Sequence, residues 1–163
     1  MSNKDCFFPF SQVRQHKGFY NDGDPENSLN EIDYADFFDL PDNDDFPYDT
    51  AWTLLCGSCN IFVLALQEAF DYNPYIIEPI DGAGFHAFCQ KNRQGKIHYV
   101  DARGVTSSFD EFMEIAKQFV HGEYIIRPVT DEDKKGWEQD DYFWEGFNFA
   151  KAIINKYSEC YLL

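Results

Sequence analysis

The stretch that decides the fold is residues 56–70, CGSCNIFVLALQEAF. After Cys59, apolar side chains recur three and four residues apart, which is the period of an α-helix. Only two polar residues follow Ile61 in this stretch, so we expect a helix that is buried nearly all round. The Gly57–Ser58 dipeptide ahead of it permits a tight turn and a cap for its first backbone amides.

Two strands are predicted downstream, over Phe85 to Gln90 and Lys96 to Ala102, joined by a turn. A four-residue loop between them places His86 directly opposite Asp101, with both side chains on one face. A two-residue loop at Gln94-Gly95 offsets the pair by two positions but keeps the same face. A loop with an odd number of residues puts them on opposite faces, because side chains alternate along a strand.

The remaining elements are expected to surround this helix and hairpin. They are a short strand at Tyr75–Glu78, a helix from the capping box Ser108–Glu111 to about Val120, a strand at Glu123–Pro128, and a final helix from about Gln139 to Tyr157. The sum is one α+β domain over residues 1–163, with a buried helix packed on a small antiparallel sheet and flanked by other helices.

The net charge of −16 is concentrated in one half of the chain of 163 residues. Residues 18–90 contain no Lys or Arg and 15 acidic residues, and residues 21–49 form an irregular acidic arm. Such a surface repels phosphates, so we expect no direct binding to nucleic acid. It attracts a basic protein or peptide, and Asp42, Asp44 and Asp45 are the candidate contact residues.

The sequence has no apolar run of the roughly 20 residues needed to cross a membrane, and no signal peptide is recognised at the start. Its five cysteines are odd in number and fit reduced thiols. We therefore expect a cytoplasmic protein.

Cys59, His86 and Asp101 are the candidate catalytic residues. A thiolate at Cys59 would be stabilised by the N-terminus of the helix, an imidazole at His86 would exchange a proton with it, and a carboxylate at Asp101 would orient that ring. The backbone N–H of Cys59 could form half of an oxyanion hole. Equally, Cys59 could be a small buried residue at a tight helix entry, and Asp101 could be held in its own turn while Arg103 pairs a surface carboxylate.

Two other uses of the cysteines remain open. Cys56 and Cys59 have the spacing of a redox pair, although the hairpin that follows is not the parallel context of such proteins. Cys56, Cys59, His86 and Cys89 could bind zinc as two closely spaced pairs, but two strand residues three apart cannot point the same way. We expect neither a metal nor another cofactor.

The order of cysteine at a buried helix, histidine on a strand and aspartate on the next strand resembles the papain-like cysteine peptidase and transglutaminase superfamily. The resemblance covers about residues 52–105. It implies Cys59 as nucleophile, His86 as general base and acid, and Asp101 as the group that fixes the ring. That superfamily often has a Gln just before the nucleophile, and here Trp52, Thr53 or Ser58 would have to complete the oxyanion and substrate site.

The expected function is a small intracellular thiol enzyme that transfers an acyl group from a protein or peptide carbonyl to water or an amine. Hydrolysis, deamidation and cross-linking share the first step, so the sequence does not separate them. The alternative is an acidic binding protein without catalysis that inhibits a basic partner by imitating nucleic acid, as in the anti-defence proteins of mobile elements. The oligomeric state is not indicated by the sequence.

Overall fold

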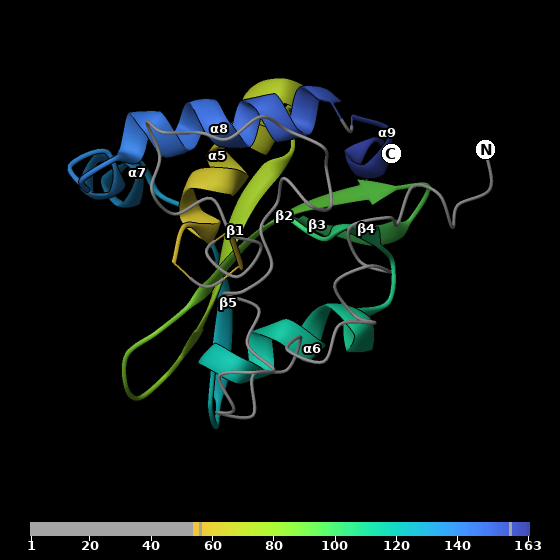
Figure 1. Cartoon of the computed structure of the whole chain (residues 1–163). Helices are drawn as coiled ribbons and strands as arrows, with labels where there is room; N and C mark the ends of the chain where they lie inside the picture. The colour runs from red at the N-terminus through yellow and green to blue at the C-terminus, as the bar shows by residue number, and fades with distance from the viewer. Residues whose placement is uncertain (1–53, 56, 157) are drawn as a thin grey trace, which may run out of the picture.

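A five-stranded antiparallel sheet in the order β4-β3-β2-β1-β5 forms the middle of the structure, with helices on both faces (Figure 1). The computed structural model describes residues 54, 55, 57–156 and 158–163. The predicted α+β class is confirmed, whereas the acidic arm lies outside the described residues.

In the described residues, one helix is followed by four strands, then by a helix, the fifth strand and three more helices. They are α5 (Cys59–Phe70), β1 (Asn73–Pro79), β2 (His86–Arg93), β3 (Lys96–Asp101), β4 (Gly104–Thr106), α6 (Phe109–Phe119), β5 (Tyr124–Pro128), α7 (Asp131–Trp137), α8 (Phe143–Lys156) and α9 (Ser158–Tyr161). None of the helices in this part of the chain is long and apolar enough to cross a membrane.

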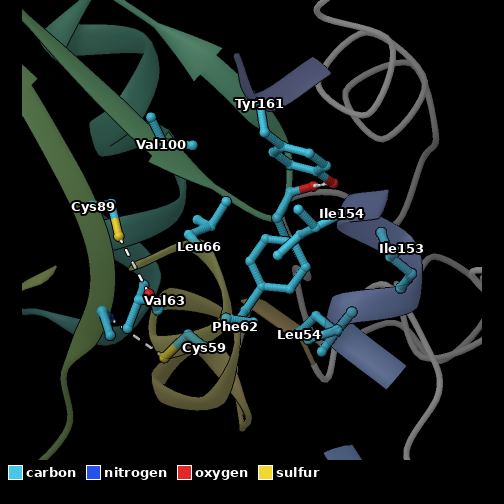
Figure 2. Close-up of a cluster of buried hydrophobic side chains, with 14 of the residues drawn as sticks. Leu54, Cys59, Phe62, Val63, Leu66, Cys89, Val100, Ile153, Ile154 and Tyr161 are labelled. Atoms are coloured by element: carbon cyan, nitrogen blue, oxygen red, sulfur yellow. Dashed lines mark hydrogen bonds between the residues drawn. The ribbon is translucent and has the colours of Figure 1, made fainter. Parts of the chain in front are cut away.

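Helix α5 is the predicted buried helix, with every residue from Cys59 to Leu66 buried. It lies between the sheet and α8, as Figure 1 shows. Phe62, Val63 and Leu66 belong to one buried cluster with side chains of β2, β3 and α8, several of them drawn in Figure 2. The helix ends at Asp71, which takes a left-handed conformation with φ 57°.

The opposite face of the sheet carries an aromatic cluster under α6. The ring of Phe112 lies 4.5 Å from that of Phe88 and 5.0 Å from that of Tyr99, measured between centroids. The side chain of Ser108 caps α6 by accepting a hydrogen bond from the Glu111 N–H. His86 and Asp101 lie on this aromatic face, because they have the strand parity of Phe88 and Tyr99.

The β2–β3 hairpin has the two-residue loop, at Gln94 and Gly95, and the four-residue loop was wrong. Both loop residues have positive φ, 54° and 79°, which fits the tight turn that matches the twist of a hairpin. Arg93 pairs with Lys96, so the ladder continues to the turn. Since both loops have an even number of residues, His86 and Asp101 remain on one face.

Four elements differ from the sequence prediction. Strand β4 and helix α7 were not predicted, and a capping box between Thr130 and Asp133 starts α7. The final helix starts at Phe143 rather than near Gln139, and a short α9 follows it. Tyr142 has φ 63°, which no α-helix contains, so the chain turns there before α8 begins.

Candidate active site

The fold brings the three candidate residues together from three separate elements. Cys59 is the first residue of α5, His86 is the first residue of β2, and Asp101 is the last residue of β3. The ladder between β2 and β3 ends at the pair Cys89–Val100, so His86 lies beyond it, where the N-terminus of α5 meets the sheet. All three side chains are at least nine-tenths buried.

The His86 ring lies between two hydrogen-bond acceptors. Its Nε2 is 3.1 Å from Asp101 Oδ2, and its Nδ1 is 3.2 Å from the carbonyl oxygen of Leu55. A carbonyl oxygen only accepts, so Nδ1 must carry a proton to make that bond. A carboxylate also accepts, and the arrangement therefore suits an imidazolium that donates from both nitrogens.

The electrostatics of the ring agree with its hydrogen bonds. Burial alone lowers the pKa of His86, because the fully buried ring loses its hydration when charged. Hydrogen bonds to Asp101 and Cys59, together with the negative charge of those groups, outweigh burial and raise the pKa to about 9. His86 is therefore protonated at neutral pH.

The Cys59 sulfur lies at the helix N-terminus and faces β2. Its Sγ accepts a hydrogen bond from the Ala87 N–H at 3.4 Å, drawn as a dashed line from Cys59 in Figure 2. A thiolate at this position has three sources of stabilisation: the Ala87 N–H, the positive end of the α5 dipole, and the imidazolium of His86.

Asp101 is held on both of its oxygens. Oδ1 accepts from the backbone N–H of Arg103 at 2.9 Å and from its Nε at 3.0 Å, and Oδ2 accepts from Arg103 Nη2 at 2.7 Å. Burial by itself raises the pKa of Asp101, but the charge of Arg103 and the hydrogen bonds from His86 and Arg103 hold it well below its usual range. The carboxylate stays ionised.

Arg103 is the functional candidate that sequence reasoning missed. The sequence alternative in which Arg103 pairs a surface carboxylate is wrong, because its side chain is fully buried and contacts both carboxylate oxygens of Asp101, two residues earlier. The available signal was the spacing itself, because the side chains of an Asp and an Arg two residues apart across a turn are close enough to pair. Nothing in the sequence alone distinguishes that arrangement from a solvent-exposed pair.

The remaining predicted site residues contribute less or lie outside the described part. Ser58 precedes α5 and is buried, but its side chain makes no capping hydrogen bond. Its carbonyl oxygen instead accepts from the backbone N–H groups of Ile61 and Phe62. The other candidates for the oxyanion, partner and redox sites lie outside the described residues: Trp52, Thr53, Asp42, Asp44, Asp45 and Cys56.

The described residues do not form the zinc site considered above. Cys89 has the strand parity of Ala87 and packs toward α5, where its Sγ donates to the Val63 carbonyl oxygen at 3.4 Å, as Figure 2 shows. His86 faces α6 instead, on the other side of the sheet. Cys89 and His86 therefore cannot bind the same metal ion. Within the described ranges, no group of three metal-binding side chains comes together.

In the part of the chain that the structure describes, exposed residues adjoin the site at its edge. Cys59 is 5% exposed, while Gly57 and Gly84, each two residues from a candidate catalytic residue, are exposed. A cavity of about 350 Å³ occurs elsewhere, at the turn of the β2–β3 hairpin, and it is lined by Arg93, Gln94, Lys96, His98 and Leu163. It does not include the candidate catalytic residues.

Searches of protein-family models, of curated proteins and of solved structures find no match for this chain. The case for function therefore rests on the geometry of the site.

Proposed function

We propose that the chain is a thiol acyl-transfer enzyme with Cys59 as nucleophile, His86 as general acid and base, and Asp101 as the residue that orients the ring. One observation carries this proposal. The His86 ring is held between Asp101 and the carbonyl oxygen of Leu55, four residues ahead of Cys59, and a hydrogen bond to Cys59 helps to raise the pKa of the ring. An imidazolium beside a sulfur is the resting state that a thiolate nucleophile requires.

The reaction would begin with attack of the Cys59 thiolate on the carbonyl carbon of a peptide or carboxamide. As the C–N bond breaks, His86 gives a ring proton to the leaving amine, and a thioester forms on Cys59. Water or a second amine then attacks the thioester and gives its proton to His86, and the Cys59 thiolate leaves. The order of helix, strand and strand supports membership of the papain-like and transglutaminase-like superfamily.

The burial of Cys59 limits the substrate. Cys59 is only 5% exposed, so we expect a small reagent to reach it more easily than a folded protein chain, which needs the groups that cover this residue to move apart. A substrate that presents a carbonyl on a flexible segment or side chain fits this constraint best. A basic segment is favoured because the chain carries a net charge of −16.

The test is the rate at which iodoacetamide alkylates each cysteine of the full chain at about pH 6, measured by peptide mass spectrometry. Cys160 is a matched control because it is also 5% exposed. We expect Cys59 to react at least about ten times faster than Cys160, because an ordinary thiol is largely protonated at that pH. We also expect His86→Gln to abolish the advantage. Equal rates for the two cysteines would refute the proposal.

A further inference from the structure

Arg103 is the most heavily bonded charged side chain around the site, and the reaction proposed above does not use it. It is fully buried, and its guanidinium contacts both oxygens of Asp101. The same group also donates to two backbone carbonyl oxygens of α6, from Nη2 to Phe112 at 3.0 Å and from Nη1 to Glu111 at 3.4 Å. Arg103 therefore joins the carboxylate to the helix that covers it.

This placement has a direct effect on His86. Asp101 Oδ2 accepts hydrogen bonds from His86 Nε2 and from Arg103 at the same time. The Phe112 ring lies 5.9 Å from the His86 ring, so α6 contacts both ends of the hydrogen-bonded chain. Any movement of Arg103 changes the direction in which Asp101 presents its oxygen to the imidazole.

We infer that Arg103 is a positioning residue of this site: it keeps Asp101 ionised and turned toward His86, and it fixes that carboxylate to α6. A buried carboxylate without a counter-charge takes up a proton rather than stay ionised. A planar guanidinium supplies that charge in two parallel hydrogen bonds and so also fixes orientation. The inference rests on the proposed function only where it concerns the reactivity of Cys59.

Among the residues that the structure describes, few charged and titratable groups lie near Asp101. They are Arg103 on the β3–β4 turn, His86 and Cys89 on β2, and Cys59 on α5. On α6, Glu111 turns its carboxylate to the Thr106 hydroxyl, 2.9 Å away, rather than to Asp101. The positive charges that face the carboxylate are thus those of Arg103 and His86.

The first experiment measures ionisation of Asp101 directly, from the ¹³C chemical shift of its carboxyl carbon in the full chain between about pH 3 and 8. In the wild type we expect no titration above about pH 4. In Arg103→Met we expect a midpoint at least about one pH unit higher than in the wild type, because burial then acts unopposed by that charge. Arg103→Lys retains the charge and should keep the midpoint low. An Arg103→Met protein with the wild-type titration overturns the inference.

The second experiment measures the pH dependence of Cys59 alkylation in the same proteins. We expect the acidic limb of Arg103→Met to move up by about one pH unit or more, because a neutral Asp101 no longer stabilises the imidazolium. In Arg103→Lys we expect the acidic limb of the alkylation profile to return to its wild-type pH. The alkylation rate on the plateau should stay below that of the wild type, because an ammonium cannot hold both carboxylate oxygens in one plane. Profiles that superimpose on the wild type overturn the inference.

Arg127→Met is the matched control, since Arg127 bridges Glu78 at 2.8 Å and Asp133 at 2.7 Å away from the site. It removes a comparable paired arginine and should leave the alkylation profile unchanged. A control that shifts the profile as much as Arg103→Met overturns the inference, because the effect would then follow from general loss of stability. Should Arg103→Met fail to fold, Arg103→Lys decides: a wild-type plateau rate rules out the need for the fork.

The two proposals fail separately. If Cys59 of the wild type reacts no faster than Cys160, the proposed function is wrong, and the ¹³C titration still decides whether Arg103 controls Asp101. If Cys59 is activated but Arg103→Met behaves as the wild type in both measurements, the inference is wrong and the proposed function remains.

Discussion

The protonation state of His86 is the property on which the chemistry of the site depends, and it can be measured without a substrate. The hydrogen bonds and negative charges around the ring raise its pKa to about 9, compared with 6.5 for an unperturbed histidine. This interval corresponds to about 3 kcal/mol in favour of the imidazolium, at about 1.4 kcal/mol for each pH unit. At pH 7 the charged ring should therefore exceed the neutral ring by about a hundredfold.

Replacement of Asp101 by Asn removes the negative charge and one of the two acceptor oxygens that His86 and Arg103 share, and it leaves the Arg103 charge facing the ring. All three changes disfavour the imidazolium, so we expect the pKa of His86 to fall by at least about one pH unit. The assay is a titration of the ¹⁵N-labelled imidazole by NMR between about pH 5 and 10, which covers both values.

Asp133→Asn is the control for this titration, because Asp133 pairs Arg127 and does not contact His86. It should leave the His86 titration unchanged. A wild-type ring that titrates near 6.5, or an Asp101→Asn ring that titrates as the wild type, would refute the reasoning from the hydrogen bonds of the ring.

Three other predictions concern stability and thiol reactivity. Asp101→Asn and Arg103→Met should each cost about 3–5 kcal/mol in the free energy of unfolding, because each removes one partner of a buried ion pair. In urea titrations the double variant should cost less than the sum, and additive costs would count against the pair. Because the pKa of Asp101 is lowered on folding, its contribution is complete above about pH 4 and is lost as the pH falls, so the double variant should also lose less stability than the wild type on acidification. Cys89 is fully buried and its pKa is raised by burial, so at about pH 8 iodoacetamide should modify it only after unfolding; modification of the native protein would contradict its placement. Gly95→Val should cost about 1–2 kcal/mol in thermal unfolding, because φ is 79° there, whereas exposed Lys96→Val should cost less than about 0.5 kcal/mol. An equal loss in both variants would show that the loop conformation is not the cause.

The parts of the fold that follow from local periodicity were predictable. Helix α5 is read from the spacing of its apolar residues, and its bounds agree with the structure because burial and helix period point the same way. To predict that His86 and Asp101 lie on one face of the sheet, it was enough to assume a loop with an even number of residues. The loop length itself was not predictable, since the turn chemistry at residues 92–95 suits two lengths.

Other features depend on contacts that no local pattern contains. The inward turn of Arg103 is fixed by carbonyl oxygens of Glu111 and Phe112, which lie eight or nine residues later and meet it only after α6 packs on the sheet. The turn at Tyr142 likewise runs against the ordinary preference of a tyrosine, which rarely adopts a positive φ. The position of Cys59 near His86 could be hypothesised from a family resemblance, but the hydrogen bond from Ala87 to its sulfur could not.

The left-handed residue at the end of α5 has a practical consequence for every experiment above. Asp71 is exposed and its backbone N–H already closes the helix on the Gln67 carbonyl oxygen, so a side chain is not needed there. Glycine adopts this conformation without steric cost, and Asp71→Gly should add up to about 1 kcal/mol to the stability of the protein. Thermal denaturation would measure the gain. In this stabilised variant, a substitution of a buried charge can cost more free energy before the chain unfolds.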